Sequence, residues 1–260
     1  MKPISAYSQD DFLRLVLQGP PGTGKTVKAC QFPGSAIVNL DRNLGGPIRF
    51  MQEHNLTLPV GFVEVDTDDN GQPVPLNLRY QRMSSEVGKL AADNSIGTIV
   101  IDSASNLAPL LQQEVLRQQG KTKIEDFKDG RQFWGFFYTA GMQLMSQLTQ
   151  IRKHVVLIAH EVLDKDEKGN PIYPVKVNWP GRLGEIIGVF FTDVWRCEVD
   201  TEITGKGTMW KFKVRTMPDA RYVLKNSMGL PPVFEFDWKI IEEKLKRTIV
   251  NLDKVADSKT

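Results

Sequence analysis

One short stretch of the chain has the residue types and spacing of a phosphate-binding loop. Residues 15–30 read LVLQGPPGTGKTVKAC, in which an apolar run is followed by glycines, a lysine and a threonine at the spacing G-x-x-x-x-G-K-[ST]. Glycine allows successive backbone N–H groups to point at phosphate oxygens, at the positive end of the following helix. The stretch therefore predicts a site for a nucleoside triphosphate. The predicted binding residues are Gly19, Pro20, Pro21, Gly22, Thr23, Gly24, Lys25, Thr26 and Val27.

Two side chains of this loop and one distant carboxylate predict how a magnesium ion is held. Lys25 can reach the β- and γ-phosphates, and the hydroxyl of Thr26 can bind Mg²⁺. Such a site also needs a carboxylate at the tip of a neighbouring strand, and IVIDSASNL supplies Asp102 after β-favouring residues. Asp102 could instead cap the next helix, although Ser103 or Ser105 can do this equally well. We therefore expect Mg²⁺ at Thr26 and Asp102.

The composition narrows the class of protein. The 41% hydrophobic and 25% charged fractions are those of a soluble globular protein, and the formal charge of +2 excludes a histone-like polycation while permitting a local basic patch. No apolar run approaches the roughly 20 residues that cross a bilayer, and the N-terminus lacks a signal-peptide core. The two cysteines show no metal-binding spacing and are expected to be buried thiols. These features predict a cytoplasmic protein without a membrane partner.

Apolar runs alternate with helical patterns along the chain. This alternation predicts an α/β fold with a mostly parallel sheet covered by helices on both faces, and antiparallel strands added at the C-terminal edge. We expect one domain over 13–250, a leader over 1–12 and a flexible tail over 251–260. Strands are expected at 13–17, 36–40, 61–65, 98–101, 155–159, 192–199 and 209–216. Helices are expected at 25–31, 78–93, 104–118, 131–152 and 238–247, and a hairpin or mobile loop at 163–182.

The residue after Asp102 helps to separate families that share this loop. Helicases and AAA+ machines usually place a glutamate there, where it activates the attacking water. Ser103 occupies the position here. The stretch GPPGTGKT taken alone suggests an AAA+ protein, but IVIDSAS argues against it.

Four stretches, in order, resemble the RecA-like core of recombination ATPases. They are GPPGTGKT, AIVNLDRNLGG, IVIDSASNL and HVVLIAHE, within a resemblance that covers roughly Leu13 to Asn226. The chain is most similar to the compact phage-encoded Sak-type single-strand annealing proteins. The resemblance implies a RecA-like P-loop fold, ATP and Mg²⁺ as ligands, and ATP hydrolysis in phage DNA recombination or single-strand annealing in the host cytoplasm.

The resemblance also implies a water-polarising glutamate two residues after the aspartate that ends the second strand. This chain reads Asp41-Arg42-Asn43. Asn43 can orient a water molecule but cannot accept its proton. Asp41 or Glu64 could act instead, hydrolysis could be slow, or Asp41 could simply serve as a cap or turn residue.

In RecA-like proteins a polar residue at the end of a central strand senses the γ-phosphate. His160 matches that position in HVVLIAHE, with Glu161 beside it. A histidine there can bond a phosphate oxygen and pull on the following loop when the phosphate leaves.

The resemblance implies that two loops contact single-stranded DNA. Basic side chains beside aromatic rings suit this ligand, because cations pair with phosphates and rings stack on unpaired bases. Both loops also carry acids, and Trp179 could be a core anchor. The candidates are Lys121, Lys123 and Arg131 in the first loop, and Tyr173, Lys176, Trp179 and Arg182 in the second.

RecA-like ATPases usually bind ATP between subunits, so the resemblance implies a homo-oligomer, either a ring or a filament. Lys213 and Arg215 are candidates for a cation supplied to a neighbour's γ-phosphate. Alternating charges on an exposed strand would look the same. A single-stranded-DNA-binding protein is a further possible partner.

Two other functions stay open. The first is a nucleotide-gated switch or scaffold that scarcely hydrolyses ATP, which Asn43 favours. The second is a small-molecule kinase, which is less favoured because the loop after His160 is not an arginine-rich lid. ATP rather than GTP is what the resemblance implies, and no guanine-reading N-K-x-D stretch is present.

Overall fold

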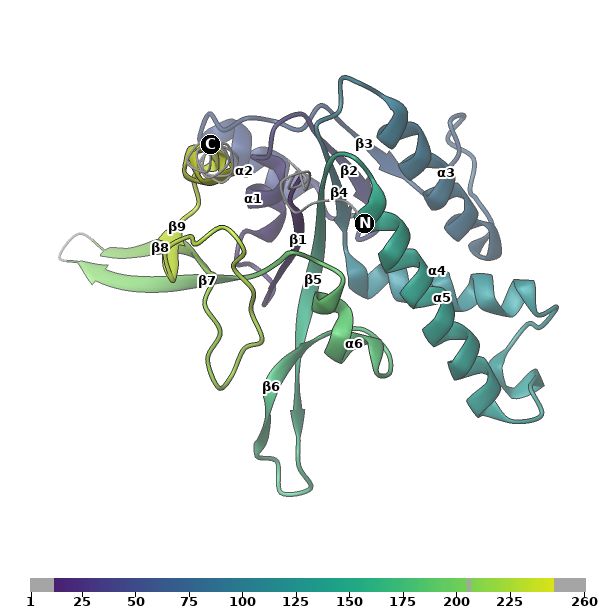
Figure 1. The fold of residues 1–260 in the computed structure, drawn as a ribbon. Coiled ribbons are helices and arrows are strands. Elements are labelled where there is room, and N and C mark those ends of the chain that lie inside the picture. The colour runs from purple at the N-terminus through teal and green to yellow at the C-terminus, as the bar shows by residue number, and fades with distance from the viewer. Residues whose placement is uncertain (1–11, 205–206, 246–260) are drawn as a thin grey trace, which may run out of the picture.

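A computed structural model describes residues 12–204 and 207–245 of the chain (Figure 1). Its strands are β1 (Arg14–Gly19), β2 (Ser35–Asn39), β3 (Gly61–Glu64), β4 (Thr98–Asp102), β5 (His154–Lys165), β6 (Pro171–Val177), β7 (Asp193–Thr204), β8 (Gly207–Arg215) and β9 (Val233–Glu235). Its helices are α1 (Lys25–Cys30), α2 (Gly45–Glu53), α3 (Arg79–Ala92), α4 (Ala104–Gln118), α5 (Gly130–Gln150) and α6 (Leu183–Ile186), and residues 238–245 are also helical. Short 3₁₀ helices lie at Leu76–Leu78, Ile124–Asp126 and Ile187–Val189.

A single twisted sheet organises the described residues. Its strand order is β3-β2-β4-β5-β1-β7-β8-β9. The pairs from β3 to β7 are all parallel, whereas β8 and β9 are antiparallel additions, and β6 pairs with the far end of β5. The carboxyl ends of β1, β4 and β5 therefore lie side by side, which is where ligands bind in open α/β sheets.

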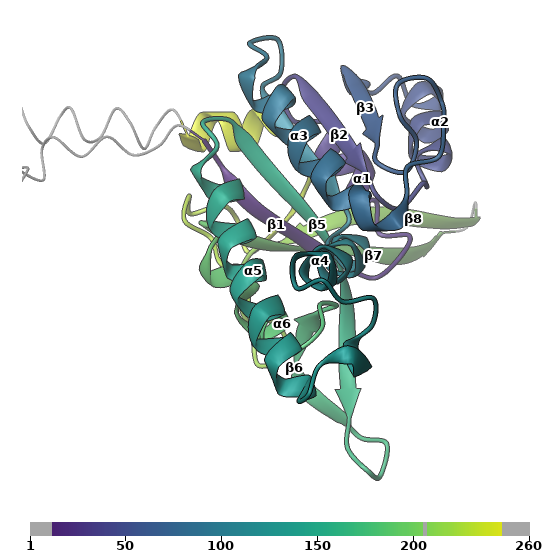
Figure 2. The ribbon, with the colours of Figure 1, turned by 90° about the vertical axis from the view of Figure 1, so that its right-hand side faces the viewer.

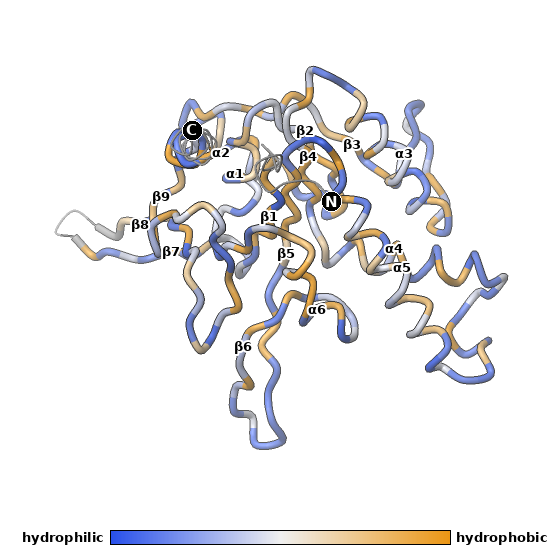
Figure 3. Tube along the Cα trace, in the orientation of Figure 1, coloured by the Kyte–Doolittle hydropathy of each residue, from blue (hydrophilic) through white to orange (hydrophobic). Residues whose placement is uncertain are grey.

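Helices cover both faces of the sheet because its central strands are apolar on both sides. Every residue of β1 and β4 is buried. Alternate strand residues pack against α3, α4 and α5 on one face, and against α1, α2 and the 238–245 helix on the other, as Figure 1 shows. In Figure 3 the central strands are accordingly hydrophobic, whereas the tip of the β5–β6 hairpin is hydrophilic.

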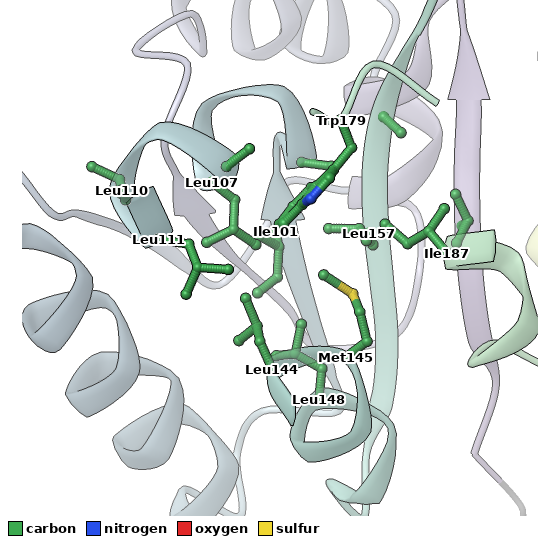
Figure 4. Close-up of a cluster of buried hydrophobic side chains, with 14 of the residues drawn as sticks. Ile101, Leu107, Leu110, Leu111, Leu144, Met145, Leu148, Leu157, Trp179 and Ile187 are labelled. Carbon is green, nitrogen blue, oxygen red and sulfur yellow. The ribbon is translucent and has the colours of Figure 1, made fainter. Parts of the chain in front are cut away.

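The larger core cluster anchors the base of that hairpin. Trp179, just beyond β6, stacks on Phe137 of α5 with ring centroids 6.0 Å apart. Figure 4 shows Trp179 among side chains of α4, α5 and the sheet, including Leu107 and Leu157. A Cβ at Gly141 of α5 would lie 2.5 Å from a methyl of Leu183, so a larger residue there would force the Leu183 side chain to move. The base of the hairpin is therefore fixed by packing.

Two long β-ribbons project from the body. The β5–β6 hairpin extends beyond the carboxyl edge of the sheet, and the β7–β8 ribbon extends sideways (Figures 1 and 2). Among the described helices, none is both long enough and apolar enough to cross a membrane.

The structure confirms the predicted α/β fold, with its mostly parallel sheet, covering helices and antiparallel C-terminal edge. It also differs from the predicted elements. β5 does not end at Ala159 but continues into the hairpin, and α2, α6 and β9 were not expected. The pattern of α2 is weak because the helix begins with Gly45-Gly46-Pro47 and buries only Met51. Almost all of the predicted leader and the whole predicted tail lie outside the described residues.

Candidate functional site

The loop between β1 and α1 has a backbone that depends on glycine. Gly19, Gly22 and Gly24 have positive φ angles of 151°, 77° and 74°. A Cβ at Gly19 would lie only 2.6 Å from the backbone oxygen of Cys197 on β7. A side chain at Gly19 would therefore both strain the backbone and collide with the neighbouring strand. The loop is held tightly against the sheet at the amino end of α1.

Lys25 is buried at the centre of this loop. It is 6% exposed, and its Nζ donates hydrogen bonds to the carbonyl oxygens of Gly19 and Pro20, both at 2.8 Å. Burial lowers its pKa, and the carboxylates of Asp102, Glu161 and Asp41 only partly oppose this shift. A phosphate oxygen in the loop would compete with the two carbonyls for the ammonium group.

Thr26 and Asp102 face each other across the end of β4. The Thr26 hydroxyl donates a 2.7 Å hydrogen bond to Oδ2 of Asp102. Asp102 is only 5% exposed. Burial raises the pKa of Asp102 to about 6, although the hydrogen bond from Thr26 lowers it. A hydroxyl and a carboxylate are oxygen ligands of the kind that Mg²⁺ prefers. The two predicted metal-binding residues therefore lie together, and their chemistry fits that ion.

Asp41 is the centre of a polar network beside this pair. Its Oδ1 accepts hydrogen bonds from Ser103 Oγ and Asn106 Nδ2, both at 2.7 Å. Its Oδ2 lies 3.3 Å from Nε2 of His160 on β5. The carboxylate is therefore held by the start of α4 on one side and by a central strand on the other. The sequence identified Asp41 and His160 but did not reveal the contacts of Ser103 and Asn106.

A cavity of about 890 Å³ connects these groups. A cavity of this size is typical of small-molecule sites. Its polar end is lined by the glycine-rich loop together with Lys25, Thr26, Asp41, Asn43, Asp102 and His160. Its other end is lined by Val27, Lys28, Gln31, Phe50, Leu56, Phe212, Phe236 and Trp238, among others.

The sequence analysis missed the aromatic end of the cavity. Phe50 of α2 and Phe212 of β8 approach edge to face, with ring centroids 6.2 Å apart. Their elements are far apart along the chain, and α2 itself was not predicted. No local sequence pattern predicts that these two rings meet. The order of the strands places β8 beside β7, and Phe212 then packs against Lys28 of α1.

The two other candidate acids lie in different surroundings. Glu64 is on the edge strand β3, opposite Asn39 of β2, and does not line the cavity. Glu161 is buried and accepts a bidentate interaction from Arg196 of β7. Burial raises the pKa of Glu161, and the Arg196 guanidinium opposes this shift. Of the candidate bases, only Asp41 lines the cavity.

The candidate DNA-binding residues differ in how far their side chains are exposed to solvent. Lys121 and Lys123 are exposed between α4 and α5, Arg131 is exposed in the first turn of α5, and Tyr173 is 46% exposed on the hairpin. Trp179 is only 5% exposed and packs in the core. The prediction that its ring stacks on a base is therefore wrong.

Two further residues of the second loop complete this set. Arg182 is exposed. Lys176 is paired with Asp164 at 3.0 Å and with Glu185 at 2.9 Å. These two carboxylates offset the charge that Lys176 would offer to a phosphate.

The candidate trans-acting cations are already paired within the chain. On β8, Lys213 forms an ion pair with Asp200 at 2.5 Å, and Arg215 pairs with Glu198 at 3.1 Å. Both carboxylates lie on β7, so the pairs run across the ribbon. A role at a neighbouring subunit would require these pairs to open.

Comparison with known proteins places the chain in a family. No curated protein matches it. A KaiC-like protein from the hyperthermophilic archaeon Pyrococcus horikoshii OT3, known from its crystal structure, is similar over 82% of this chain and 83% of that chain, with 16% sequence identity and a TM-score of 0.42. A family model described as an AAA domain matches residues 11–226.

The match to the family model spans the glycine-rich loop and the strands that carry Asp41, Asp102 and His160. It corrects the argument that Ser103, in place of a glutamate, disfavours an AAA protein. In the structure Ser103 instead holds Asp41. The domain type and the loop identify a P-loop nucleotide-binding core. The chain belongs to the AAA-domain family.

Proposed function

We propose that the chain is a magnesium-dependent ATPase with a RecA-like core, in which Asp41 polarises the attacking water. The observation that carries the proposal is the position of Asp41. Its carboxylate lines the same cavity as Lys25 and Asp102, within hydrogen-bonding distance of His160. A general base must reach the attacking water, and of the acids that the sequence offered as this base, only Asp41 lines the cavity.

The residues of the cavity would act as follows. The N–H groups of the loop and the Lys25 ammonium bind the β- and γ-phosphates, replacing the contacts to Gly19 and Pro20. Thr26 and Asp102 hold Mg²⁺, which when bound offsets negative charge on the phosphates. Asp41 orients a water molecule in line with the γ-phosphorus and takes its proton. A new P–O bond forms as the bond to the bridging oxygen breaks, releasing ADP and phosphate.

The aromatic end of the cavity supports a nucleoside as the rest of the ligand. Phe50 and Phe212 line the cavity and lie edge to face. A purine ring stacks well in such surroundings. We assign ATP rather than GTP from the family resemblance of the sequence.

We further propose that single-stranded DNA stimulates the reaction, in recombination or annealing. Two observations support this. Basic side chains are exposed after α4 and at the start of α5, namely Lys121, Lys123 and Arg131. In addition, the N–H of Asn178 at the base of the hairpin donates to the carbonyl of His160 at 2.8 Å, so a shift of His160 at the γ-phosphate would be passed to that hairpin. A homo-oligomer and a single-stranded-DNA-binding protein are the expected partners.

One observation favours the second candidate, a nucleotide-gated switch with little hydrolysis. Both oxygens of Asp41 are engaged, by Ser103 and Asn106 on one side and by His160 on the other. These three partners compete with an attacking water molecule for the two carboxylate oxygens. The kinase has no comparable support.

The test is phosphate release by the full chain with and without single-stranded DNA, for the wild type and Lys25→Ala. We expect release that DNA stimulates and that Lys25→Ala abolishes. Tight ATP binding with negligible release in both conditions would instead establish the switch. Absence of ATP binding by the folded protein with Mg²⁺ present would overturn both.

A further inference from the structure

Lys28 is a second buried lysine in the wall of the cavity, and the mechanism above makes no use of it. It lies on α1 one helical turn beyond Lys25 and is 5% exposed. Its Nζ donates a 2.9 Å hydrogen bond to the carbonyl of Thr23 and lies 5.3 Å from the centroid of the Phe212 ring. An ammonium group has three donors. One carbonyl and one ring face therefore leave part of its donor capacity unused among the described residues.

The charge of Lys28 also lacks a counter-charge. Among the described residues, the partners of its Nζ are the carbonyl of Thr23 and the ring of Phe212, and no ion pair joins it to a carboxylate. A buried cation without an anion is costly, which points to a ligand that supplies the anion.

Lys25 provides the comparison. Both lysines are almost fully buried, both line the cavity, and both donate to carbonyl oxygens of the same loop. Glu235 and Asp237 also line the cavity, but neither forms an ion pair with Lys28. The geometry that makes Lys25 a phosphate-binding residue is therefore repeated at Lys28.

The position of Lys28 indicates which part of a nucleotide it would meet. A Cβ at Gly24 would lie 3.1 Å from Nζ of Lys28 and 3.4 Å from Cδ1 of Phe212. The ammonium thus lies where the glycine-rich loop meets the ring of Phe212. Resting on the nucleotide-binding function proposed above, we propose that Lys28 is a second phosphate-binding cation, which contacts the phosphate nearest the nucleoside.

The experiment is calorimetric titration of the full chain with Mg-ATP and Mg-ADP. We expect Lys28→Met to weaken both by the same factor, about 10- to 100-fold, because both nucleotides carry the α-phosphate and a charge-assisted hydrogen bond has this worth. Lys25→Met should weaken Mg-ATP more than Mg-ADP, because it loses the γ-phosphate contact as well. Lys89→Met, on the outer surface of α3, is the matched control and should bind both like the wild type.

A second readout separates binding from folding. Removing a buried, uncompensated charge should keep or raise the melting temperature of the ligand-free protein while the shift produced by Mg-ADP becomes smaller. Nucleotide affinities within twofold of wild type in Lys28→Met, or a melting temperature lowered with no loss of affinity, would show that Lys28 only supports the loop. If Lys25→Met also bound normally, the proposed nucleotide site itself would be wrong.

Discussion

At the scale of single residues, two side chains with the same functional group can differ in what they contact, because their surroundings differ. Asp41 and Glu64 are both carboxylates at or just beyond the carboxyl end of a strand. Asp41 lies at the carboxyl edge among Ser103, Asn106 and His160, whereas Glu64 lies on the outermost strand. Because proton transfer requires contact with the attacking water, the difference in position decides between them.

Asp41→Asn should lower the rate of phosphate release by about 10²- to 10⁴-fold and change ATP affinity little, because the amide keeps the shape but accepts no proton. Glu64→Gln, a matched change outside the cavity, should stay within about twofold of wild type. Single-turnover phosphate release measures both variants. Normal release by Asp41→Asn would remove Asp41 from the mechanism.

His154, at the start of β5, makes stability depend on pH. Its Nδ1 accepts a hydrogen bond from the N–H of Leu13, and burial lowers its pKa from 6.5 to about 4, with Arg14 adding to the shift. Between these values the unfolded chain binds more protons, so stability falls as the pH falls from about 6.5 to 4, by up to roughly 3 kcal/mol. His154→Asn should flatten this part of the profile in urea unfolding between pH 4 and 7. An unchanged slope would assign the effect to another group.

At the scale of elements, the β5–β6 hairpin joins a fixed base to a projecting tip. Asn178 and Trp179 lie at the base, next to His160 and in the core, while Tyr173 lies on the exposed part. Movement at His160 would therefore reach the tip through a packed segment rather than through a loose loop.

Trp179→Ala should destabilise the protein by about 3–5 kcal/mol, because it removes a large buried ring that stacks on Phe137. Tyr173→Ala, an exposed aromatic on the same hairpin, should change the free energy of unfolding by no more than about 0.5 kcal/mol. Chemical denaturation at neutral pH measures both. Equal effects of the two changes would contradict the packing described here.

At the scale of the whole molecule, apolar side chains are exposed at opposite edges of the sheet. On the β7–β8 ribbon, Ile203 is 85% and Trp210 63% exposed, although ion pairs cover the other face of the ribbon. Near β3, Val60 is 61% and Phe62 60% exposed. Two different patches on opposite edges suit head-to-tail contacts between copies, which close into rings or extend as filaments.

We therefore expect Trp210→Ser to lower the average mass of the protein in sedimentation at micromolar concentration, because it removes the largest exposed ring of the ribbon. Val189→Ser, an exposed apolar residue away from both patches, is the control and should sediment like the wild type. A wild-type protein that is monomeric with and without Mg-ATP would contradict this expectation.

The sequence by itself determined the phosphate loop, the pairing of Thr26 with Asp102, and the sheet with helices on both faces. Each depends on local signals, namely the spacing of glycines, an acid at a strand tip, and the alternation of apolar residues. Only the tertiary structure decided that Asp41 rather than Glu64 lies in the cavity, that Trp179 is a core residue, and that Lys28 and Phe212 adjoin the loop. These outcomes depend on strand order and burial, which are set by contacts between segments far apart in the chain.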